Sequence, residues 1–429
     1  MMRQIETAFA IFALIFLTGA TVTILTPASA LLAYGSSGSP MVRLLALAVG
    51  LSGVGLFVLH KNAINHLISR YWPILIPPAF AVLSIFWAAD LSLALRRCAA
   101  LVMVTLLGVW LAERYSKRAL FNIVLAAGLI LCFLSLAAIV AKPGLGTHTA
   151  SNGANLEHIG AWRGLLAHKN DFGRLAALVG VMCVIAAFTR SRLRLGYLVG
   201  ALLALGLVLG SRSGQAVVLF ALPPIAVAGM MWLRTLTPQF RALAIVLVVP
   251  FSAVVAVGSG FVVTAVLEAL GKDATLTGRT DIWYAVWQAL TGHFLLGGGY
   301  GSGWQVVSVE VQKIMGWSRG LLSHAHNGYL DLMTDIGAIG VGLTIALYLW
   351  TLGKTFRAIV AGKDIEFAAF GFAVVVFCLA GNWVASFLLA HNSVYWVLVV
   401  AIFCKLSQAP EYRVQYRYVR ANKYNAIAQ

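Results

Sequence analysis

Long apolar runs, separated by short polar segments, make up most of this chain. Runs long enough to cross a membrane as helices lie near residues 7–31, 41–60, 73–90, 98–115, 119–141, 171–189, 193–211, 213–233, 241–266, 326–353, 366–384 and 386–405. A transmembrane helix needs about 20 apolar residues, and it satisfies its backbone hydrogen bonds internally, as lipid requires. The pattern therefore predicts an all-α integral membrane protein with about twelve transmembrane helices, forming one polytopic domain over residues 1–429.

Some boundaries in this pattern are open. Only residues 211–214 separate the seventh run from the eighth, and the last two runs almost touch. The first run ends in Pro-Ala-Ser-Ala at residues 27–30, which resembles a signal-peptidase site. Because this apolar stretch is long for a signal peptide and its head carries Glu6, we expect an uncleaved first helix.

Composition agrees with the membrane class, and the distribution of charge predicts how the chain is oriented in the membrane. The chain is 61% hydrophobic and 10% charged, whereas soluble domains are about 45–50% apolar and about 25% charged. If the N-terminus is cytoplasmic, most of the 31 lysines and arginines fall in cytoplasmic segments, as the positive-inside rule requires. The net charge of +17 then reflects topology and attraction to anionic lipid heads. Because the basic residues are scattered over many short loops, nucleic acid is not an expected partner.

Two longer polar segments, near residues 142–170 and 267–325, interrupt the apolar pattern and face outward in this orientation. In the second segment, apolar residues recur at spacings of three and four: Ile282, Trp283, Val286, Trp287 and Leu290. This spacing predicts an amphipathic helix, and its tryptophans suit the depth of the lipid headgroups. We therefore expect residues 267–325 to form an extracytoplasmic loop with an interfacial helix.

Six of the nine histidines and three arginines share this outward placement. They are His148, His158, His168, His293, His324, His326, Arg163, Arg212 and Arg279. A site built from them would be extracytoplasmic, where ATP and nucleotide sugars are absent. Its substrate would then carry its own energy, as a lipid-linked diphosphate does.

Arg212 and Arg279 are candidate ligands for such a diphosphate. Arg212 lies between two apolar runs that leave almost no room for a loop, and a charge at membrane depth often marks a functional site. Arginine suits a diphosphate because its planar fork makes two parallel charge-assisted hydrogen bonds. Arg279 begins the amphipathic helix, where backbone N–H groups also favour an anion. The alternatives are an Arg212 that snorkels to the interface and an Arg279 that only anchors its helix.

His326 is the candidate general base, since an unperturbed histidine pKa of about 6.5 allows proton abstraction near neutral pH. Asp331 follows in the first turn of the next run. It could orient the histidine or bind the acceptor substrate, although the helix dipole alone favours an acid there. His324 and His326 alternate, but two histidines without a third ligand are a weak zinc signal. We expect no metal and no cofactor. Further candidates for substrate binding are Arg163, His168, Asn170, Trp283, His324 and Asn327.

Cysteine and glycine add little chemistry. The five cysteines lie in apolar runs without a CxxC pattern, so neither a disulfide framework nor a zinc site is expected. The glycine-rich segment 297–303 lacks the lysine of a phosphate loop. It favours a tight turn or a close approach of the backbone to a substrate.

Four motifs in this order resemble the O-antigen ligase/polymerase superfamily, and most of all its ExoQ-type exopolysaccharide production proteins. They are HKN-x-x-G at 168–173, SRSG at 211–214, GRTDIW at 278–283, and SHAHNGYLDL followed by GAIG at 323–340. The resemblance implies a metal-independent, inverting glycosyltransferase of the bacterial inner membrane, with both termini cytoplasmic and the active site outside. By it, Arg212 and Arg279 hold the diphosphate and His326 activates the acceptor hydroxyl.

The same resemblance implies the partners. They are a polyprenyl-diphosphate-linked oligosaccharide, a glycan acceptor, membrane lipids, and candidate polysaccharide flippase and chain-length or export proteins. We favour a polymerase that extends lipid-linked repeat units into exopolysaccharide. The alternatives are an O-antigen ligase that transfers the glycan to lipid A–core, and a non-enzymatic glycan flippase or export component.

Overall fold

The structure, a computed structural model, describes residues 2–25, 40–150, 156–244, 279–316 and 324–408. Within these ranges every regular element is a helix, and Thr147 and Trp162 form an isolated antiparallel bridge. The elements before the first polar segment are α1 (Met2–Phe16), α2 (Ala20–Leu25), α4 (Pro40–Leu59), α5 (Ala63–Ser69), η2 (Trp72–Leu75), α6 (Ile76–Leu83), η3 (Ser84–Trp87), α7 (Leu91–Arg114) and α8 (Lys117–Ala141). The remaining elements are α9 (Pro143–Gly146), η5 (Leu156–His158), α10 (Lys169–Thr189), η6 (Ser191–Leu193), α11 (Arg194–Gly210), α12 (Gly214–Thr235), α14 (Arg279–Ala289), α15 (Gly303–Met315), α16 (Gly328–Val360), α17 (Ile365–Gly381) and α18 (Val394–Ser407).

The all-α membrane class is confirmed, but the count of about twelve spans is not. Seven helices in the described part are long and apolar enough to cross a membrane, and an eighth span results if one pair of helices bent by 85° counts as one. The seven are Pro40–Leu59, Leu91–Arg114, Lys117–Ala141, Lys169–Thr189, Ser191–Gly210, Gly214–Thr235 and Gly328–Val360, and the bent pair is Ala63–Ser69 with Trp72–Trp87. The predicted span 241–266 lies outside the described residues apart from its start.

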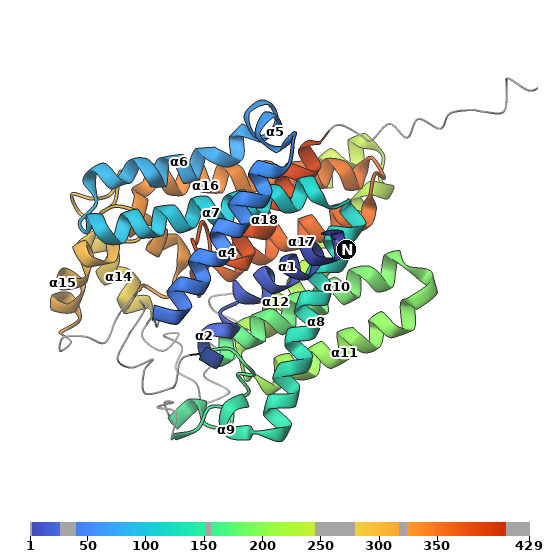
Figure 1. Cartoon of the computed structure of the whole chain (residues 1–429), viewed down its shortest axis with the longest axis horizontal. Helices are drawn as coiled ribbons and strands as arrows, with labels where there is room; N and C mark the ends of the chain where they lie inside the picture. The colour runs from blue at the N-terminus through green and yellow to red at the C-terminus, as the bar shows by residue number, and fades with distance from the viewer. Residues whose placement is uncertain (1, 26–39, 151–155, 245–278, 317–323, 409–429) are drawn as a thin grey trace, which may run out of the picture.

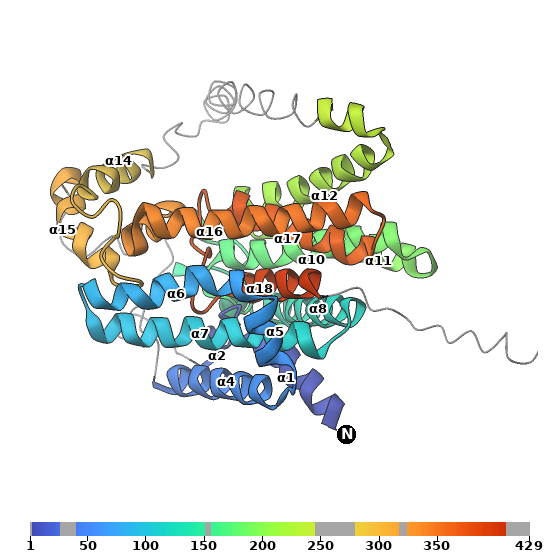
Figure 2. The same ribbon diagram turned by 90° about the horizontal axis from the view of Figure 1, so that it is seen from above.

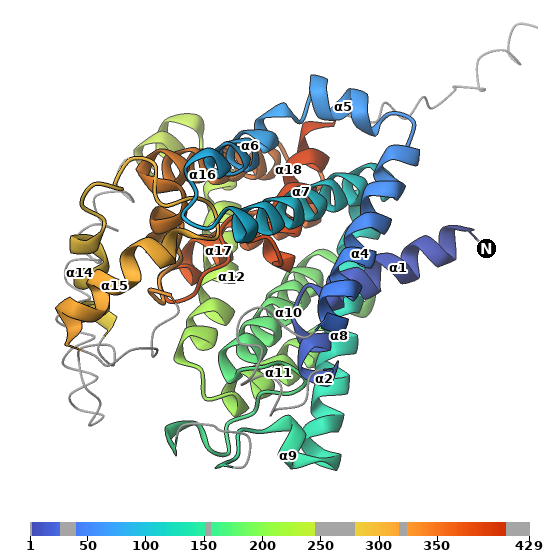
Figure 3. The same cartoon turned by 60° about the vertical axis from the view of Figure 1, so that its left-hand side comes forward.

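The helices pack in successive layers. In Figure 2, α16, α18, α7 and α4 follow one another from top to bottom, and each packs against the next. Figure 3 shows α8, α10, α11 and α12 together in the lower half of the molecule, with α10 in contact with the other three. α14 and α15 lie at the left edge of Figure 1 and α9 at its lower edge. The two predicted outer segments therefore lie on the sides away from α5.

The first predicted span, 7–31, is not one helix in its described part. α1 ends at Phe16, Gly19 has a φ of 84°, and α2 begins at Ala20. α1 packs against α8, and an ion pair of 2.5 Å joins Glu6 to Arg114 at its base. The break leaves residues 17–19 as a short non-helical connection between α1 and α2, here called the hinge. Residues 27–30, which carry the signal-peptidase-like sequence, lie outside the described part.

The last predicted span, 386–405, begins later than its hydropathy indicates. α17 ends at Gly381 and α18 begins only at Val394. Between them, the Asn382 side chain accepts hydrogen bonds from the backbone N–H groups of Phe387 and Leu388 at 3.1 and 3.2 Å. Residues 382–393 are thus an ordered loop held by a buried asparagine, and they take part in the site described below.

The glycine-rich segment supports packing in place of phosphate binding. α16 is kinked at Gly337, whose φ is 64°, and a Cβ there would lie 2.2 Å from the carbonyl oxygen of Leu295. The Gly298 N–H also donates to the Thr334 carbonyl at 2.8 Å, and Asp335 accepts from the Gly303 N–H at 3.1 Å. The segment turns tightly, with positive φ at Gly297, Gly299 and Gly301, and its close backbone contact is with α16. A close approach to substrate stays a prediction.

Candidate active site

The segment around His326 is clamped from both sides. The N–H of the preceding residue, Ala325, donates to Asp331 Oδ1 at 2.6 Å, and the Ala325 carbonyl accepts from Trp283 Nε1 at 3.1 Å. Ala325 itself is fully buried. One face of the histidine segment is therefore fixed by α16 and the other by α14, so the predicted amphipathic helix holds this loop through Trp283.

His326 itself adopts a strained backbone conformation. Its φ is 54°, in the left-handed region that residues other than glycine rarely enter. Such strain costs on the order of 1–3 kcal/mol and concentrates at functional sites. The next residue, Asn327, caps α16 by accepting hydrogen bonds from the N–H groups of Tyr329 and Leu330 at 3.0 and 3.3 Å. The Asn327 side-chain oxygen is thus engaged in positioning His326. A role of Asn327 in binding substrate stays a prediction.

Arg279 shares an electrostatic environment with both histidines of this segment. The rings of His324 and His326 have centroids 4.0 Å apart. Burial, followed by the charges of His324 and Arg279, lowers the pKa of His326 to about 4, and Asp331 opposes this effect. Burial and then Arg279 also lower the pKa of His324. At neutral pH His326 is therefore unprotonated, as a general base must be, and it lies beside a cation that can hold an anion.

The N-terminus of α10 brings the first polar segment to the same place. His168 caps α10, with its Nδ1 accepting from the Asn170 N–H at 3.2 Å. Burial and the neighbouring charges lower the pKa of His168 to about 4, and His326 is one of those charges. Asp171, on the first turn of α10, acts on the other segment: its charge raises the pKa of His324, opposite to the effect of burial. The two outer segments, far apart in sequence, thus converge on one site.

Arg212 lies in the turn between α11 and α12, next to residues 159 and 160. Like His326 it has a positive φ, 50°, and its Nη1 donates to the Ile159 carbonyl at 3.3 Å. The serines on either side of it are buried, and Ser213 caps α12. The guanidinium is consequently exposed on a rigid turn. Within the described residues no hydrogen bond or ion pair joins Arg212 directly to His326.

The turn that holds Arg212 packs closely on α10 at Gly173. A Cβ on Gly173 would lie 2.7 Å from Ser211 Oγ and 2.8 Å from Ala216 Cβ. We expect Gly173→Val to displace the Arg212 turn, with an overpacking cost of about 1–3 kcal/mol. A lower melting temperature of the detergent-purified protein would report this cost. Gly206→Val, where a Cβ meets nothing within 4 Å, is the matched control; equal melting temperatures of the two variants would contradict the packing argument.

Three histidine rings gather next to Arg212. The centroids of His148 and His158 each lie 5.2 Å from that of His168 and 5.9 Å from one another. His148 Nε2 accepts from the Lys169 N–H at 3.1 Å, so its proton is on Nδ1, whereas that of His168 is on Nε2. His158 Nδ1 is buried without a hydrogen-bond partner in the described part of the chain. Burial and neighbouring charges lower the pKa of His148 and of His168 to about 4, so these two rings offer neutral N–H donors, which suit an oxygen-rich ligand.

Arg163 has a different environment. It is buried, and it donates to the carbonyls of Thr147 at 3.3 Å and Leu166 at 3.5 Å. Burial lowers its pKa. These bonds tie together the loop that carries His148 and His168, so Arg163 supports the site through the loop, and direct contact with substrate stays a prediction.

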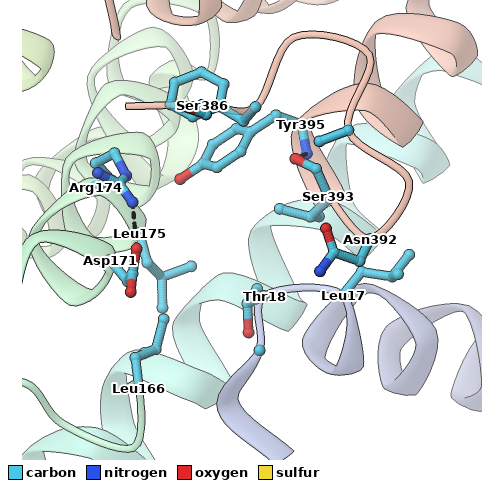
Figure 4. A pocket seen from close by; sticks show the side chains of 14 residues that line it. Leu17, Thr18, Leu166, Asp171, Arg174, Leu175, Ser386, Asn392, Ser393 and Tyr395 are labelled. Atoms are coloured by element: carbon cyan, nitrogen blue, oxygen red, sulfur yellow. Dashed lines mark hydrogen bonds and ion pairs between the residues drawn. The ribbon is translucent and has the colours of Figure 1, made fainter. Parts of the chain in front are cut away.

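A cavity of about 200 Å³ opens at the first turns of α10, where Asp171 and Arg174 lie on its wall (Figure 4). It lies between the hinge at residues 17–19, the first turns of α10, and the loop 382–393. The Ser386 hydroxyl, on its wall, donates to Asp331 Oδ2, the same carboxylate that holds Ala325. The cavity is thus connected to the His326 segment by one shared carboxylate.

The structure therefore brings His324, His326, Arg279, Trp283 and Asp331 together, with His168 adjoining them. Arg212 lies against residues 159 and 160. Sequence reasoning did not assign Ser386, Arg174 or the loop 382–393. The signal for them was a set of polar residues inside an apolar run: Asn382, His391, Asn392 and Ser393.

Comparison with known proteins relates this chain to O-antigen ligases and to an exopolysaccharide production protein. The model of the O-antigen ligase family matches residues 175–345, a range that includes Arg212, Arg279 and His326. The exopolysaccharide production protein ExoQ of Rhizobium meliloti (strain 1021) is 28% identical over 313 residues, which cover 70% of this chain and 69% of ExoQ.

Proposed function

We propose that this chain acts as a member of the O-antigen ligase family and polymerises polyprenyl-diphosphate-linked oligosaccharide repeat units into exopolysaccharide. The family match over residues 175–345 and the likeness to ExoQ support this proposal. The observation that carries this proposal is the unprotonated His326, clamped through Ala325 and lying beside Arg279. His326 can act as the base for a sugar hydroxyl, and Arg279 is a cation that can bind a diphosphate.

In the proposed reaction, the oxygen of an acceptor hydroxyl attacks the anomeric carbon of the donor glycan. The bond from that carbon to the diphosphate oxygen breaks with its electron pair, and the configuration inverts. The hydroxyl proton passes to His326, and polyprenyl diphosphate leaves. Arg279 and Arg212 offset the negative charge that grows on the leaving group, as oxyanion-type stabilisation does, so the mechanism is proposed to be metal-independent.

The setting is proposed to be the extracytoplasmic face of the bacterial inner membrane, with both termini cytoplasmic. The polyprenyl tail would stay in lipid while the glycan reaches the two outer segments. A flippase that delivers repeat units and proteins that control chain length or export are the expected partners.

The test is polymer production in a strain that lacks this protein. Cells carrying the wild-type chain should form long polymer, whereas cells carrying His326→Ala at equal membrane abundance should accumulate single lipid-linked repeat units. A ligase, the second candidate that the family description supports, would leave polymer formation intact and only prevent its transfer to lipid A–core. Normal glycans in the variant would favour a flippase or export component.

The pH dependence offers an independent check. Burial, His324 and Arg279 lower the pKa of His326 to about 4 in the free protein, and a base works only when unprotonated. Activity is therefore lost as pH falls through this pKa, and the acid limb of kcat/KM, which reports the free enzyme, should lie well below pH 6.5. A bound diphosphate would oppose the Arg279 charge, so the acid limb of kcat should lie at higher pH than that of kcat/KM. Initial rates between about pH 3 and 8 measure both limbs; a kcat/KM limb near 6.5 would contradict the assignment.

A further inference from the structure

The cavity between the hinge 17–19, α10 and the loop 382–393 has no assigned ligand. Its volume of about 200 Å³ far exceeds the space that one water molecule needs. Figure 4 shows side chains from these three separate regions around it: Thr18, Asp171, Arg174, Ser386, Asn392 and Tyr395. We propose that this cavity binds the sugar of the acceptor glycan whose hydroxyl group His326 deprotonates, an inference that rests on the proposed glycosyltransferase function.

The lining fits a neutral, hydroxyl-rich ring better than an anion. It combines a carboxylate, a guanidinium, hydroxyl groups and an amide with the apolar faces of Leu17, Leu175 and Phe387. Asp171 accepts a hydrogen bond from Arg174, so the one guanidinium of the lining is already neutralised. Sugar hydroxyls both donate and accept hydrogen bonds, which matches a wall that offers both kinds of group.

Arg174 is fixed with part of its hydrogen-bonding capacity unused. Its Nη1 donates to Gln215 Oε1 at 3.1 Å, and its guanidinium lies 5.8 Å from the ring centroid of Phe387. Its Nε is buried and has no hydrogen-bond partner in the part of the chain that the structure describes. A buried donor without a partner is costly, and an oxygen of a bound ligand would satisfy it.

The position of the cavity distinguishes acceptor from donor. Neither Arg212 nor Arg279 lines it, so it does not contain the residues proposed to hold the diphosphate. It is joined instead to the base, since Ser386 on its wall donates to Asp331 and Asp331 holds the N–H of Ala325. The cavity is thus linked to the histidine segment through the Asp331 carboxylate, and its lining contains neither arginine proposed to hold the diphosphate.

Asn392 is the residue that tests this inference with least structural disturbance. It is exposed, lies at the edge of the cavity near the end of the loop 382–393, and directly precedes Ser393, which caps α18. Asn392→Ala removes its amide, and Asn392→Trp places a large ring at the cavity. Asn62, which is exposed at the start of α5 without a side-chain cap bond, provides the matched controls Asn62→Ala and Asn62→Trp.

The assay uses the full chain in liposomes, with repeat units isolated on their polyprenyl diphosphate as donor. The acceptor probe is the same repeat unit released from its lipid by mild acid, which lacks a diphosphate and cannot act as donor. We expect the acceptor KM to rise about tenfold in Asn392→Ala, the effect of about one lost hydrogen bond, and more in Asn392→Trp. The donor KM should stay at the value of the Asn62 controls. An unchanged acceptor KM in both variants, or a rise in donor KM alone, overturns the proposal.

Direct binding separates this inference from the proposed function. Calorimetric titration of the released repeat unit into the protein in nanodiscs needs no turnover. Suppose that the wild-type protein binds the repeat unit, that both Asn392 variants bind it more weakly, and that the wild type forms no product from donor and acceptor. This result would keep the cavity as a glycan site and refute the glycosyltransferase. Equal binding by wild type and both variants, in a protein that does form product, would keep the enzyme and refute the cavity.

Discussion

His326→Gln should lower the rate of glycan transfer by about 10²–10⁴-fold, the range that a general base contributes. Glutamine has a similar size and can still donate and accept hydrogen bonds, but it cannot take the proton of a sugar hydroxyl. The surrounding clamp does not depend on the His326 ring, because Ala325 and Asn327 make it through Asp331, Trp283 and the first turn of α16. The rate constant for forming the first product from isolated lipid-linked repeat units measures the effect.

His293→Gln is the matched control, since His293 is an exposed histidine of the same polar segment. It should retain the wild-type rate, and both variants should melt at similar temperatures. A His326→Gln protein that is folded and transfers glycan at the wild-type rate would remove His326 from the mechanism. A loss of equal size in His293→Gln would indicate that any change in this segment disturbs the fold.

Hydropathy located most of the helices but not the irregular segments that form the site. The run 98–115 is found as α7, Leu91–Arg114, and the run 119–141 as α8, Lys117–Ala141, because burial in lipid imposes a length that the sequence displays. The breaks at Gly19 and at Asn382 were not predicted. Both breaks lie in runs that remain apolar on average. Only tertiary contacts with α10 and α18 offset the helical hydrogen bonds that are lost there.

The candidate site was predicted to a similar extent. Arg279, Trp283, His326 and Asp331 were named from their residue types, and the structure places them around one loop. Trp283 was expected to be a membrane anchor and a substrate contact; its observed bond to Ala325 could not be foreseen, because it joins residues on two different elements. Likewise, no spacing rule connects Ser386 to Asp331, since that contact depends on how α16 and the loop 382–393 pack.

Arg279→Gln and Arg212→Gln should each lower kcat/KM by about 10²–10³-fold, the loss that follows removal of one group that stabilises an oxyanion. Their pH profiles should differ. Arg279 is one of the charges that lower the pKa of His326, and Arg212 is not among them. Removing the Arg279 charge therefore raises the pKa of His326, so the acid limb of kcat/KM moves to higher pH in Arg279→Gln and stays at the wild-type position in Arg212→Gln.

This comparison tests geometry as well as charge, because the two arginines approach the donor from different elements. Arg279 begins α14 and acts electrostatically on His326, whereas Arg212 donates to the Ile159 carbonyl. If both arginines hold one diphosphate, a diphosphate-bearing polyprenyl inhibitor should lose affinity for both variants, and the double variant should lose less than the two single effects combined. Full additivity, or an acid limb that shifts in Arg212→Gln but not in Arg279→Gln, would mean that the arginines serve separate groups and that the leaving diphosphate is held elsewhere.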